Sequence, residues 1–261
     1  MQSLLFSLLI IYSLFAIYVF FRADSMIFLP QPSSYSDTED ILKIPVNQRE
    51  QISAIYLPNS QASYTLLYIH GNAEDLGDIR FFLKHLHSWG FSVFAYDYRG
   101  YGTSDGVPSE RNAYQDVNAA YHYLTQQLNV PPAQIIAYGR SVGGGSATEL
   151  ATRYPLAGLI LESTFTSAFR VVVPFPLLPF DKFSNLVKLR KVRCPVLVMH
   201  GQADLTIPFQ HGERLYQAAP QPKEFLWVAE AGHNDFTQTA GERLPQTLIF
   251  FQELIESRKV N

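Results

Sequence analysis

The chain has 261 residues, of which 47% are hydrophobic and only 16% are charged, and its formal net charge at pH 7 is −3. Globular proteins usually carry about 25% charged residues, so this composition indicates large buried faces or contact with lipid. A weakly acidic chain without a dense Lys/Arg run excludes nucleic acid as the expected partner. The single cysteine, Cys194, excludes an internal disulfide, and without CxxC or HExxH patterns we expect no metal site and no cofactor.

The N-terminal segment predicts a membrane anchor. Residues 3–21 carry no charge, and at about 1.5 Å per residue they span about 28 Å, close to one hydrocarbon core. The alternative is a cleaved signal peptide, but no Lys or Arg precedes the run and no A-x-A site follows it. We therefore expect a single-pass anchor over residues 1–22 and a tether over residues 23–40. Arg22, directly after the run, favours a cytoplasmic C-terminal domain by the positive-inside rule.

Beyond the tether, strands and helices alternate through one domain over residues 41–261. Short apolar runs predict strands, and apolar residues at helical spacing predict helices. The predicted strands cover residues 41–46, 51–57, 65–69, 92–96, 134–138, 159–161, 196–199 and 225–228. The predicted helices cover residues 78–89, 109–128, 142–153, 209–218 and 244–256. The pattern indicates an α/β fold, a mostly parallel sheet with helices on both faces and an antiparallel edge where no helix separates the first two strands.

The stretch AYGRSVGGGSA, residues 137–147, contains a G-x-S-x-G pattern centred on Ser141. A chain of this length shows such a pattern by chance roughly one time in ten, so its position matters more than its presence. A strand is predicted before Ser141 and a helix after it, which is typical of a nucleophile elbow and not of a simple glycine-rich turn. Arg140 is either a substrate-side or a structural contact, and Gly144 and Gly145 would let the helix pack closely on the sheet.

Ser141 needs a base to take its proton, and in an elbow fold the chain order is serine, acid, histidine. His233 follows the strand 225–228 in a loop, at the sheet end where active sites form, and is the predicted base. His200, at a strand end, is expected to make a structural hydrogen bond, and His211 is expected on a surface helix.

Asp204 follows the strand 196–199 by a short loop and is the predicted acid, which would orient the imidazole of His233. Glu162 is a rival at the end of the preceding strand. Asp235 is a second rival, but it lies only two residues from His233, too close in sequence for easy in-line geometry.

The oxyanion hole requires backbone N–H donors aimed at the developing charge. One donor is the N–H of Val142, the residue after the nucleophile. The other is expected from the loop HGNAEDLG after the strand 65–69, with the N–H of Asn72 first and that of Ala73 second. His70 is expected to shape this loop and not to act as a base.

Five blocks in order, HGNAEDLG, YDYRGYGTSDGVPSE, YGRSVGG, HGQADLTIP and LWVAEAGHND, resemble the α/β-hydrolase superfamily. More narrowly, they resemble the bud-emergence-type hydrolases and the membrane-associated α/β-hydrolase-domain depalmitoylases. The resemblance covers residues 40–257 and implies that Ser141, Asp204 and His233 form a catalytic triad. The chain lacks the N-terminal cysteine cluster of the depalmitoylases and has an apolar helix in its place.

A proline-rich insertion over residues 165–190 lies where this fold carries its cap. Three prolines, Pro174, Pro176 and Pro179, forbid a regular strand or a long helix there. Its apolar side chains would line an acyl pocket, touch a bilayer or simply cover the sheet; they are Phe169, Val172, Phe175, Leu177, Leu178 and Phe180. We expect Phe169, Phe175, Leu177 and Phe180 to contact the substrate.

The sequence therefore predicts a membrane-anchored serine hydrolase that cleaves an acyl ester or thioester of a small, lipid-like substrate or of an acylated protein. Two alternatives remain open. One is a serine peptidase of the prolyl-oligopeptidase or aminopeptidase type, which would need an acidic pocket for a free amine, with Glu162 the obvious candidate. The other is a membrane-tethered binding protein that retains the fold without the activity.

Overall fold

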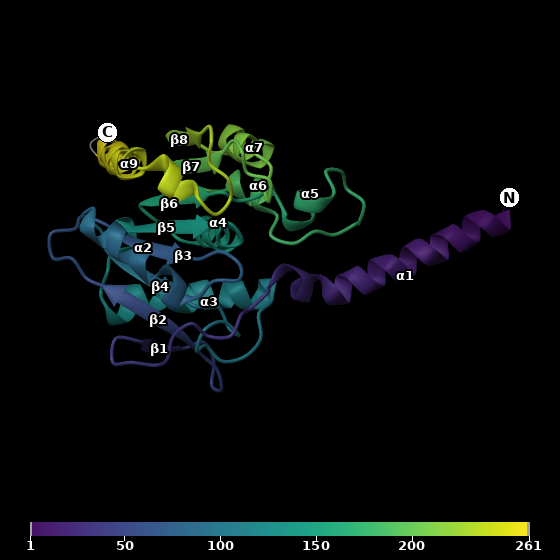
Figure 1. Ribbon diagram of the computed structural model, residues 1–261, viewed down its shortest axis with the longest axis horizontal. Coiled ribbons are helices and arrows are strands. Elements are labelled where there is room, and N and C mark those ends of the chain that lie inside the picture. The colour runs from purple at the N-terminus through teal and green to yellow at the C-terminus, as the bar shows by residue number, and fades with distance from the viewer. Residues whose placement is uncertain (1, 260–261) are drawn as a thin grey trace.

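The computed structural model describes residues 2–259 and contains an eight-stranded sheet with helices on both faces (Figure 1). The strands are β1 (Leu42–Pro45), β2 (Gln51–Leu57), β3 (Thr65–Ile69), β4 (Ser92–Tyr96), β5 (Ile135–Arg140), β6 (Gly158–Glu162), β7 (Val196–Gly201) and β8 (Lys223–Val228). Their order across the sheet is β1-β2-β4-β3-β5-β6-β7-β8. The first two pairings are antiparallel and the other five are parallel, which confirms the predicted mixed sheet and its antiparallel edge.

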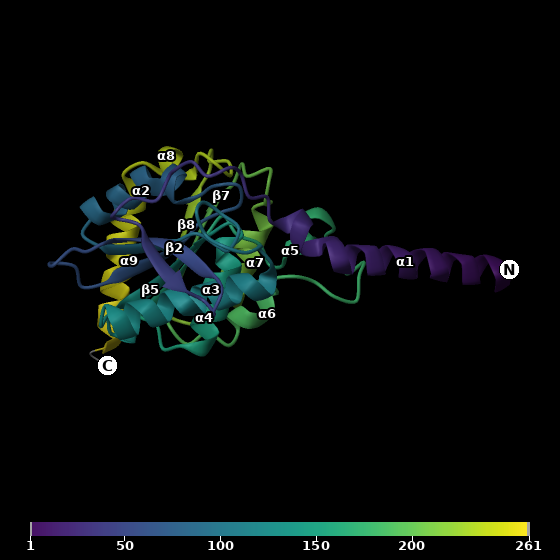
Figure 2. The same cartoon turned by 90° about the horizontal axis from the view of Figure 1, so that it is seen from below.

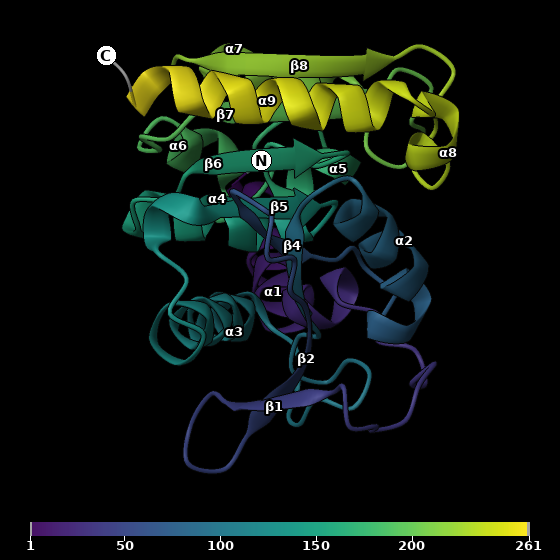
Figure 3. The same ribbon diagram turned by 90° about the vertical axis from the view of Figure 1, so that its left-hand side faces the viewer.

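The helices are α1 (Gln2–Ile27), α2 (Leu76–Ser88), α3 (Glu110–His122), α4 (Gly143–Arg153), α5 (Ala168–Val172), α6 (Asn185–Leu189), α7 (Gln210–Ala218), α8 (Phe236–Ala240) and α9 (Arg243–Lys259). One hydrophobic cluster joins one face of the sheet to α3, α4, α6 and α7, and a second joins the other face to α2, α8 and α9 (Figure 3). The central strands are buried on both faces, because a parallel sheet between two helical layers has no wet side.

Local sequence signals explain where two of these helices begin. Asp75 caps α2 in a reciprocal capping box with Asp78, and the Ser109 hydroxyl caps α3 by accepting the Asn112 N–H at 3.1 Å. The predicted helix 109–128 is not uniform, however. It changes to a π-helical turn over η1 (Tyr123–Gln127), and a short 3₁₀ turn, η2 (Pro132–Gln134), leads into β5.

Helix α1 extends away from the sheet as a long apolar rod, with the N-terminus at its far end (Figure 1). It is long and apolar enough to cross a membrane, and only 6% of its most apolar window is buried in the protein. The helix continues five residues past the predicted anchor end at residue 22. Packing explains the extension, because Ala23 is fully buried and Phe28, just beyond the helix, is a core residue that packs on Tyr98 and Phe183.

His211 lies on a surface helix, as expected, but its side chain points into the protein. His211 lies on α7 but is only 7% exposed, and its Nδ1 accepts the Thr166 N–H at 3.1 Å. It lies one helical turn before the fully buried Leu215, so both side chains point from the apolar face of α7 into the protein. Burial lowers the pKa of His211, which keeps the ring neutral and able to accept this hydrogen bond.

The insertion 165–190 contains the short helices α5 and α6 joined by an irregular loop that runs beside α1 (Figures 1 and 2). We call residues 172–180 the cap loop. No regular strand or long helix forms there, as the three prolines predict.

Candidate active site

Ser141 lies in a sharp turn between β5 and α4, at the carboxyl end of the sheet. Its backbone has φ = +52°, a left-handed conformation that is uncommon for residues other than glycine. Two hydrogen bonds hold this conformation: the Ser141 N–H donates to the Glu162 carbonyl at 2.9 Å, and the Thr164 hydroxyl donates to the Ser141 carbonyl at 2.6 Å. The turn therefore presents the Ser141 hydroxyl outward from the end of the sheet.

Glycines flank Ser141 because the turn leaves no space for side chains. A Cβ on Gly139 would lie 2.5 Å from the Gly143 carbonyl oxygen, and a Cβ on Gly143 would lie 2.1 Å from the Ile69 carbonyl oxygen. Gly144 and Gly145 would collide in the same way with Thr164 and Phe183. The extra glycines thus allow α4 to pack closely against its neighbours.

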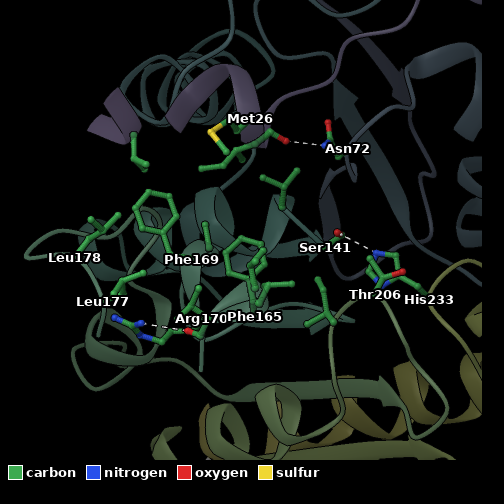
Figure 4. A pocket seen from close by; sticks show the side chains of 18 of the residues that line it. Met26, Asn72, Ser141, Phe165, Phe169, Arg170, Leu177, Leu178, Thr206 and His233 are labelled. Carbon is green, nitrogen blue, oxygen red and sulfur yellow. Dashed lines mark hydrogen bonds between the residues drawn. The ribbon is translucent and has the colours of Figure 1, made fainter. Parts of the chain in front are cut away.

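Ser141, His233 and Asp204 come from three separate loops, and hydrogen bonds join them in one row. His233 Nε2 lies 3.1 Å from Ser141 Oγ, and His233 Nδ1 lies 2.8 Å from Asp204 Oδ2. A carboxylate can only accept, so Nδ1–H donates to Asp204 and Nε2 is free to accept the serine proton. Ser141 is 8% exposed, and Figure 4 shows its hydroxyl directed toward the ring of His233.

The Asp204 carboxylate is held by more than the histidine. Its Oδ1 accepts the N–H groups of Thr206 and Ile207, each at 2.8 Å. Burial alone would raise its pKa, but the hydrogen bonds from His233 and Ile207 hold the pKa of Asp204 below its ordinary value. The group is therefore ionised at neutral pH and oriented toward the imidazole.

The two rival acids are engaged elsewhere. The Glu162 carboxylate accepts the Tyr138 hydroxyl and lies 3.4 Å from Arg140 Nε. Asp235 Oδ1 accepts the Gly232 N–H at 2.7 Å within its own turn. Neither carboxylate contacts the imidazole.

Arg140, which the sequence left unexplained, joins three loops around the site. Its guanidinium makes a bidentate contact with Glu74 at 2.8 and 2.9 Å and lies near the buried Glu162. It also donates to the His233 carbonyl oxygen at 3.2 Å and to the Asn234 side chain at 3.3 Å. Arg140, the last residue of β5, therefore ties the loop that carries His233 to the chain directly before Ser141.

The residues that carry the predicted oxyanion donors line the same cavity as Ser141. Asn72 and Val142 both line the cavity into which Ser141 opens, and within residues 2–259 neither backbone N–H donates to another protein group. The N–H of Ala73, in contrast, already donates to Asn72 Oδ1 at 3.0 Å. Asn72 is held in turn by its side chain, which donates to the Ile27 carbonyl at 2.6 Å and accepts the Tyr101 hydroxyl at 2.6 Å.

His200 and His70, for which the sequence predicts structural roles, both make hydrogen bonds to backbone carbonyl groups. His200 Nε2 contacts the Ile207 carbonyl oxygen at 2.8 Å. His70 is fully buried, with its Nδ1 2.7 Å from the Gly71 carbonyl oxygen and its Nε2 3.3 Å from Asp97. Both rings therefore shape loops around the site.

A cavity of about 510 Å³ leads away from Ser141 and His233 between the cap and α1 (Figure 4). Phe169, Leu177 and Phe180 line it, as expected, together with Val172 and Leu178. Phe175 is a correction: its side chain is 58% exposed and does not line the cavity.

The sequence did not identify four lining residues that come from α1, namely Phe15, Val19, Met26 and Ile27. They lie more than 100 residues before Ser141, and in an all-apolar segment no local signal separates a lipid-facing position from a cavity-facing one.

Comparison with solved structures identifies the fold. An esterase from Pyrococcus furiosus superposes with a TM-score of 0.71 at 17% identity, covering 87% of this chain and 100% of that one. The esterase domain of a Rhodothermus marinus protein superposes with a TM-score of 0.64 at 20% identity, covering 82% and 98%. The chain therefore has the α/β-hydrolase fold.

Sequence comparison narrows the relationship. The family model for serine aminopeptidases of the S33 type matches residues 60–188. The Caenorhabditis elegans protein aho-3, an α/β-hydrolase domain-containing protein, is 45% identical over 185 residues, which are 69% of this chain and 54% of that protein. The chain thus spans about half the length of that relative.

Alpha/beta hydrolase domain-containing protein 17B is 43% identical in Xenopus laevis and 42% identical in Homo sapiens, each over 198 residues. These alignments cover 74% of this chain and 68% of each relative. The chain belongs to the alpha/beta hydrolase domain-containing protein 17 family.

Proposed function

We propose that this protein is a membrane-anchored serine hydrolase that cleaves an acyl ester or thioester through Ser141, His233 and Asp204. The observation that carries the proposal is that the hydrogen-bonded row ends at Ser141, on the floor of an apolar cavity. Cavities of about 300–1,000 Å³ with apolar walls and few polar groups are typical of small-molecule sites. An acyl chain matches this wall, and its carbonyl carbon would lie at Ser141.

The reaction follows from the positions of the side chains. Ser141 Oγ attacks the acyl carbonyl carbon while His233 Nε2 takes the hydroxyl proton, and Asp204 stabilises the resulting imidazolium. The N–H groups of Asn72 and Val142 hold the oxyanion. The tetrahedral intermediate then expels the alcohol or thiol, which receives the proton from Nε2.

Deacylation repeats these steps with water. His233 takes a proton from water, whose oxygen attacks the acyl-enzyme carbonyl. Collapse returns the proton to Ser141 Oγ and releases a carboxylic acid. No other reactant is required, so the same row serves both half-reactions.

The peptidase alternative lacks a suitable recognition group. A free amine would need an accessible carboxylate near Ser141, but Glu162 is 1% exposed and is held by Arg140 and Tyr138. The apolar cap wall offers no replacement. An ester or thioester with an apolar acyl group therefore matches the site better than an aminoacyl amide.

The proposed organisation is an anchor over residues 1–22, a tether over residues 23–40 and a hydrolase domain over residues 41–261, with the cap at 165–190 and the hydrolase domain on the cytoplasmic side. The contacts of α1 support an anchor that is retained, not cleaved as a signal sequence. Asn72 binds the carbonyl of Ile27 and the N–H of Leu29, so cleavage near the end of α1 would remove a support of the proposed oxyanion loop.

The test of the proposal is covalent labelling with a fluorophosphonate probe, together with a panel of p-nitrophenyl esters from acetyl to palmitoyl and of aminoacyl amides. Wild-type protein is expected to be labelled and to hydrolyse the esters, and Ser141→Ala is expected to lose labelling and about 10⁴–10⁶-fold in kcat. Ser146→Ala, a nearby buried serine outside the row, is the matched control. Labelling that persists in Ser141→Ala would refute the assignment.

The anchor has a separate test. After carbonate extraction, the full chain is expected in the membrane pellet with its N-terminus intact. A soluble full-length chain would contradict the anchor without affecting the assignment of Ser141.

A further inference from the structure

A second hollow, of about 970 Å³, lies at the amino ends of the central strands. Its lining includes Ala157 and Pro195, the residues directly before β6 and β7. Ser141 follows the carboxyl end of β5, whose six residues separate the two ends of the sheet by about 20 Å. We call this hollow the basic groove, after the five cationic side chains that line it: Arg153, Arg190, Lys191, Arg193 and Arg258.

The basic groove carries an excess of positive charge that the chain as a whole does not have. Its cations come from three separate segments, namely the end of α4, the connection from α6 to β7 and the end of α9, and no Asp or Glu lines it. Since the whole chain has a formal net charge of −3 and the groove contributes five positive charges, the remaining residues carry a net charge of −8. The fold therefore collects positive charge at this place against the sign of the rest of the protein.

Most of these cations have no carboxylate partner. Arg153 is the exception, because its Nε donates to a Glu149 carboxylate oxygen at 2.7 Å. Within residues 2–259, the exposed side chains of Arg190, Lys191 and Arg193 form no ion pair, and neither does Arg258. Like charges around one hollow repel one another, and a bound anion would remove that repulsion.

The wall of the groove is fixed by the packing of the chain. Val192 and Cys194 are buried, and because side chains alternate along an extended segment, Lys191 and Arg193 both point outward on the other side. The Arg258 guanidinium donates to the Arg193 carbonyl oxygen at 2.5 Å, which ties the end of α9 to this segment. The cations are thus held in position before any ligand arrives, which lowers the entropic cost of binding.

The chemistry of the lining favours a polypeptide over a small inorganic anion. Apolar and aromatic groups lie between the cations, among them Tyr154, Leu156, Pro195 and Ile255. A free phosphate would leave these groups uncovered, whereas a peptide can cover them with its own apolar side chains. Four of the five cations are arginines, whose planar guanidinium groups bind carboxylates through two parallel hydrogen bonds.

The position of the groove disfavours a membrane surface as the occupant. The end of α9, which forms one side of the groove, and the apolar helix α1 lie on opposite sides of the domain (Figures 1 and 2). A bilayer that contains α1 therefore lies beyond the far side of the domain. Attraction between exposed charges in physiological salt extends over only about 10 Å, so the groove would act on molecules in the aqueous phase.

We propose that the basic groove is a docking site for an acidic segment of a partner protein. Carboxylates of this segment pair with Arg190, Lys191, Arg193 and Arg258, and its apolar side chains cover the lining between them. Because the groove lies at the opposite end of the sheet from Ser141, a docked partner leaves the cavity open. The inference goes beyond the proposed function and does not depend on it.

The test measures binding by fluorescence anisotropy. The full chain in neutral detergent is titrated against a short fluorescein-labelled peptide of glutamate and tyrosine residues, and against the same peptide with glutamine in place of glutamate. We expect the glutamate peptide to bind, and its affinity to fall when the salt concentration rises from about 50 to about 300 mM, because salt screens the charges. The glutamine peptide should bind at least about tenfold more weakly.

Charge reversal identifies the place of binding. Arg190→Glu combined with Arg193→Glu should weaken binding of the glutamate peptide at least about tenfold. The matched control, Arg49→Glu with Lys84→Glu, makes the same change in net charge at exposed positions outside the groove and should leave the dissociation constant within about threefold of wild type. Arg190→Gln with Arg193→Gln, a milder pair, should give an intermediate loss if thermal unfolding shows that the reversed variant is not folded. Equal losses in the groove and control variants, or equal binding of the two peptides, would overturn the proposal.

Other anions decide between the classes of ligand. Phosphatidylserine vesicles, single-stranded DNA and inorganic tripolyphosphate are offered to the same variants. If any of them binds more tightly than the glutamate peptide and loses binding on charge reversal in the groove, the assignment to an acidic protein segment is wrong. None of these measurements uses activity, so a protein whose Ser141 is not labelled would refute the proposed function and leave the result for the groove unchanged.

Discussion

Replacing Arg140 by methionine tests whether the network beside the nucleophile holds the site together. Methionine keeps much of the aliphatic stem but removes the guanidinium. Glu162, 1% exposed, would then retain only the Tyr138 hydroxyl as a partner, and Glu74 would lose its bidentate contact. Removing one partner of a buried ion pair typically costs 3–5 kcal/mol, because the other charge is left without compensation.

We expect the lower end of this range, about 3 kcal/mol near neutral pH, because the Arg140–Glu162 separation is 3.4 Å and Glu162 can bind a proton. In a chain of this size that free energy corresponds to a fall in Tm of about 6–12 °C. The surface pair of Arg80 and Asp40 has the same 2.8 Å contact distance as Arg140 and Glu74 but lies in solvent, so Arg80→Met should cost less than about 1 kcal/mol.

The cost should depend on pH. Burial raises the pKa of Glu162, and Arg140 opposes that effect, so removing Arg140 raises the pKa further. When a carboxyl group has a higher pKa in the folded state than in the unfolded state, the free energy of unfolding of the protein falls as pH rises through the folded-state pKa. The deficit of Arg140→Met should therefore be larger at about pH 8 than at about pH 5.5.

The assay is thermal unfolding of the full chain in detergent at both pH values, with kinetics on a short-chain ester. Adding Glu162→Gln removes the unpaired charge, so the double variant should recover at least half of the lost Tm and lose the added pH dependence. Because Arg140 also binds the His233 carbonyl, kcat should remain low in the double variant. A Tm for Arg140→Met within about 2 °C of wild type at pH 8 would refute the reasoning, since it corresponds to less than about 1 kcal/mol.

Two further substitutions test the row and the turn. Asp204→Asn should lower kcat about 10⁴-fold with a similar Tm, because the amide no longer selects the Nδ1–H tautomer of His233. Asp235→Asn, the control, should leave kcat within about threefold of wild type. The reverse result would show that Asp235, and not Asp204, is the acid. Gly143→Ala should lower the free energy of unfolding by about 1–3 kcal/mol and weaken fluorophosphonate labelling, because the added Cβ would lie 2.1 Å from a backbone oxygen. If the variant keeps the Tm and the labelling of the wild type, the turn has more space than the structure gives it.

The prediction of the sheet succeeded because the pattern that sets it is local. Buried strands such as β3 and β4 read as continuous apolar runs, and their predicted bounds agree with the structure at both ends. The start of α3 was also predictable, because Ser109 is a capping residue in the right place. The π-helical end of that helix carried no such signal, and neither did the short helices of the cap.

The candidate site divides in the same way. The elbow around Ser141 could be predicted because its residues are contiguous in the sequence. Its glycines are required by close contacts within the turn and with the neighbouring strand. The sequence alone did not decide which of three carboxylates, those of Asp204, Glu162 and Asp235, is the acid. The one that reaches His233 depends on the geometry of separate loops. The inward side chain of His211 and the outward ring of Phe175 could not be predicted for the same reason: residue type does not disclose which way a side chain points.

By itself the sequence determined the alternating elements, the elbow, the order of serine, acid and histidine, and an apolar N-terminal segment. Only the tertiary structure decided that Asp204 reaches the imidazole, that Arg140 joins the loops of the site, and that α1 forms a wall of the cavity. Periodicity and turn chemistry act over a few residues, so a sequence displays them directly. The α1–cap contact joins residues 165 positions apart, and within a uniformly apolar helix only packing against a partner distinguishes one face from another.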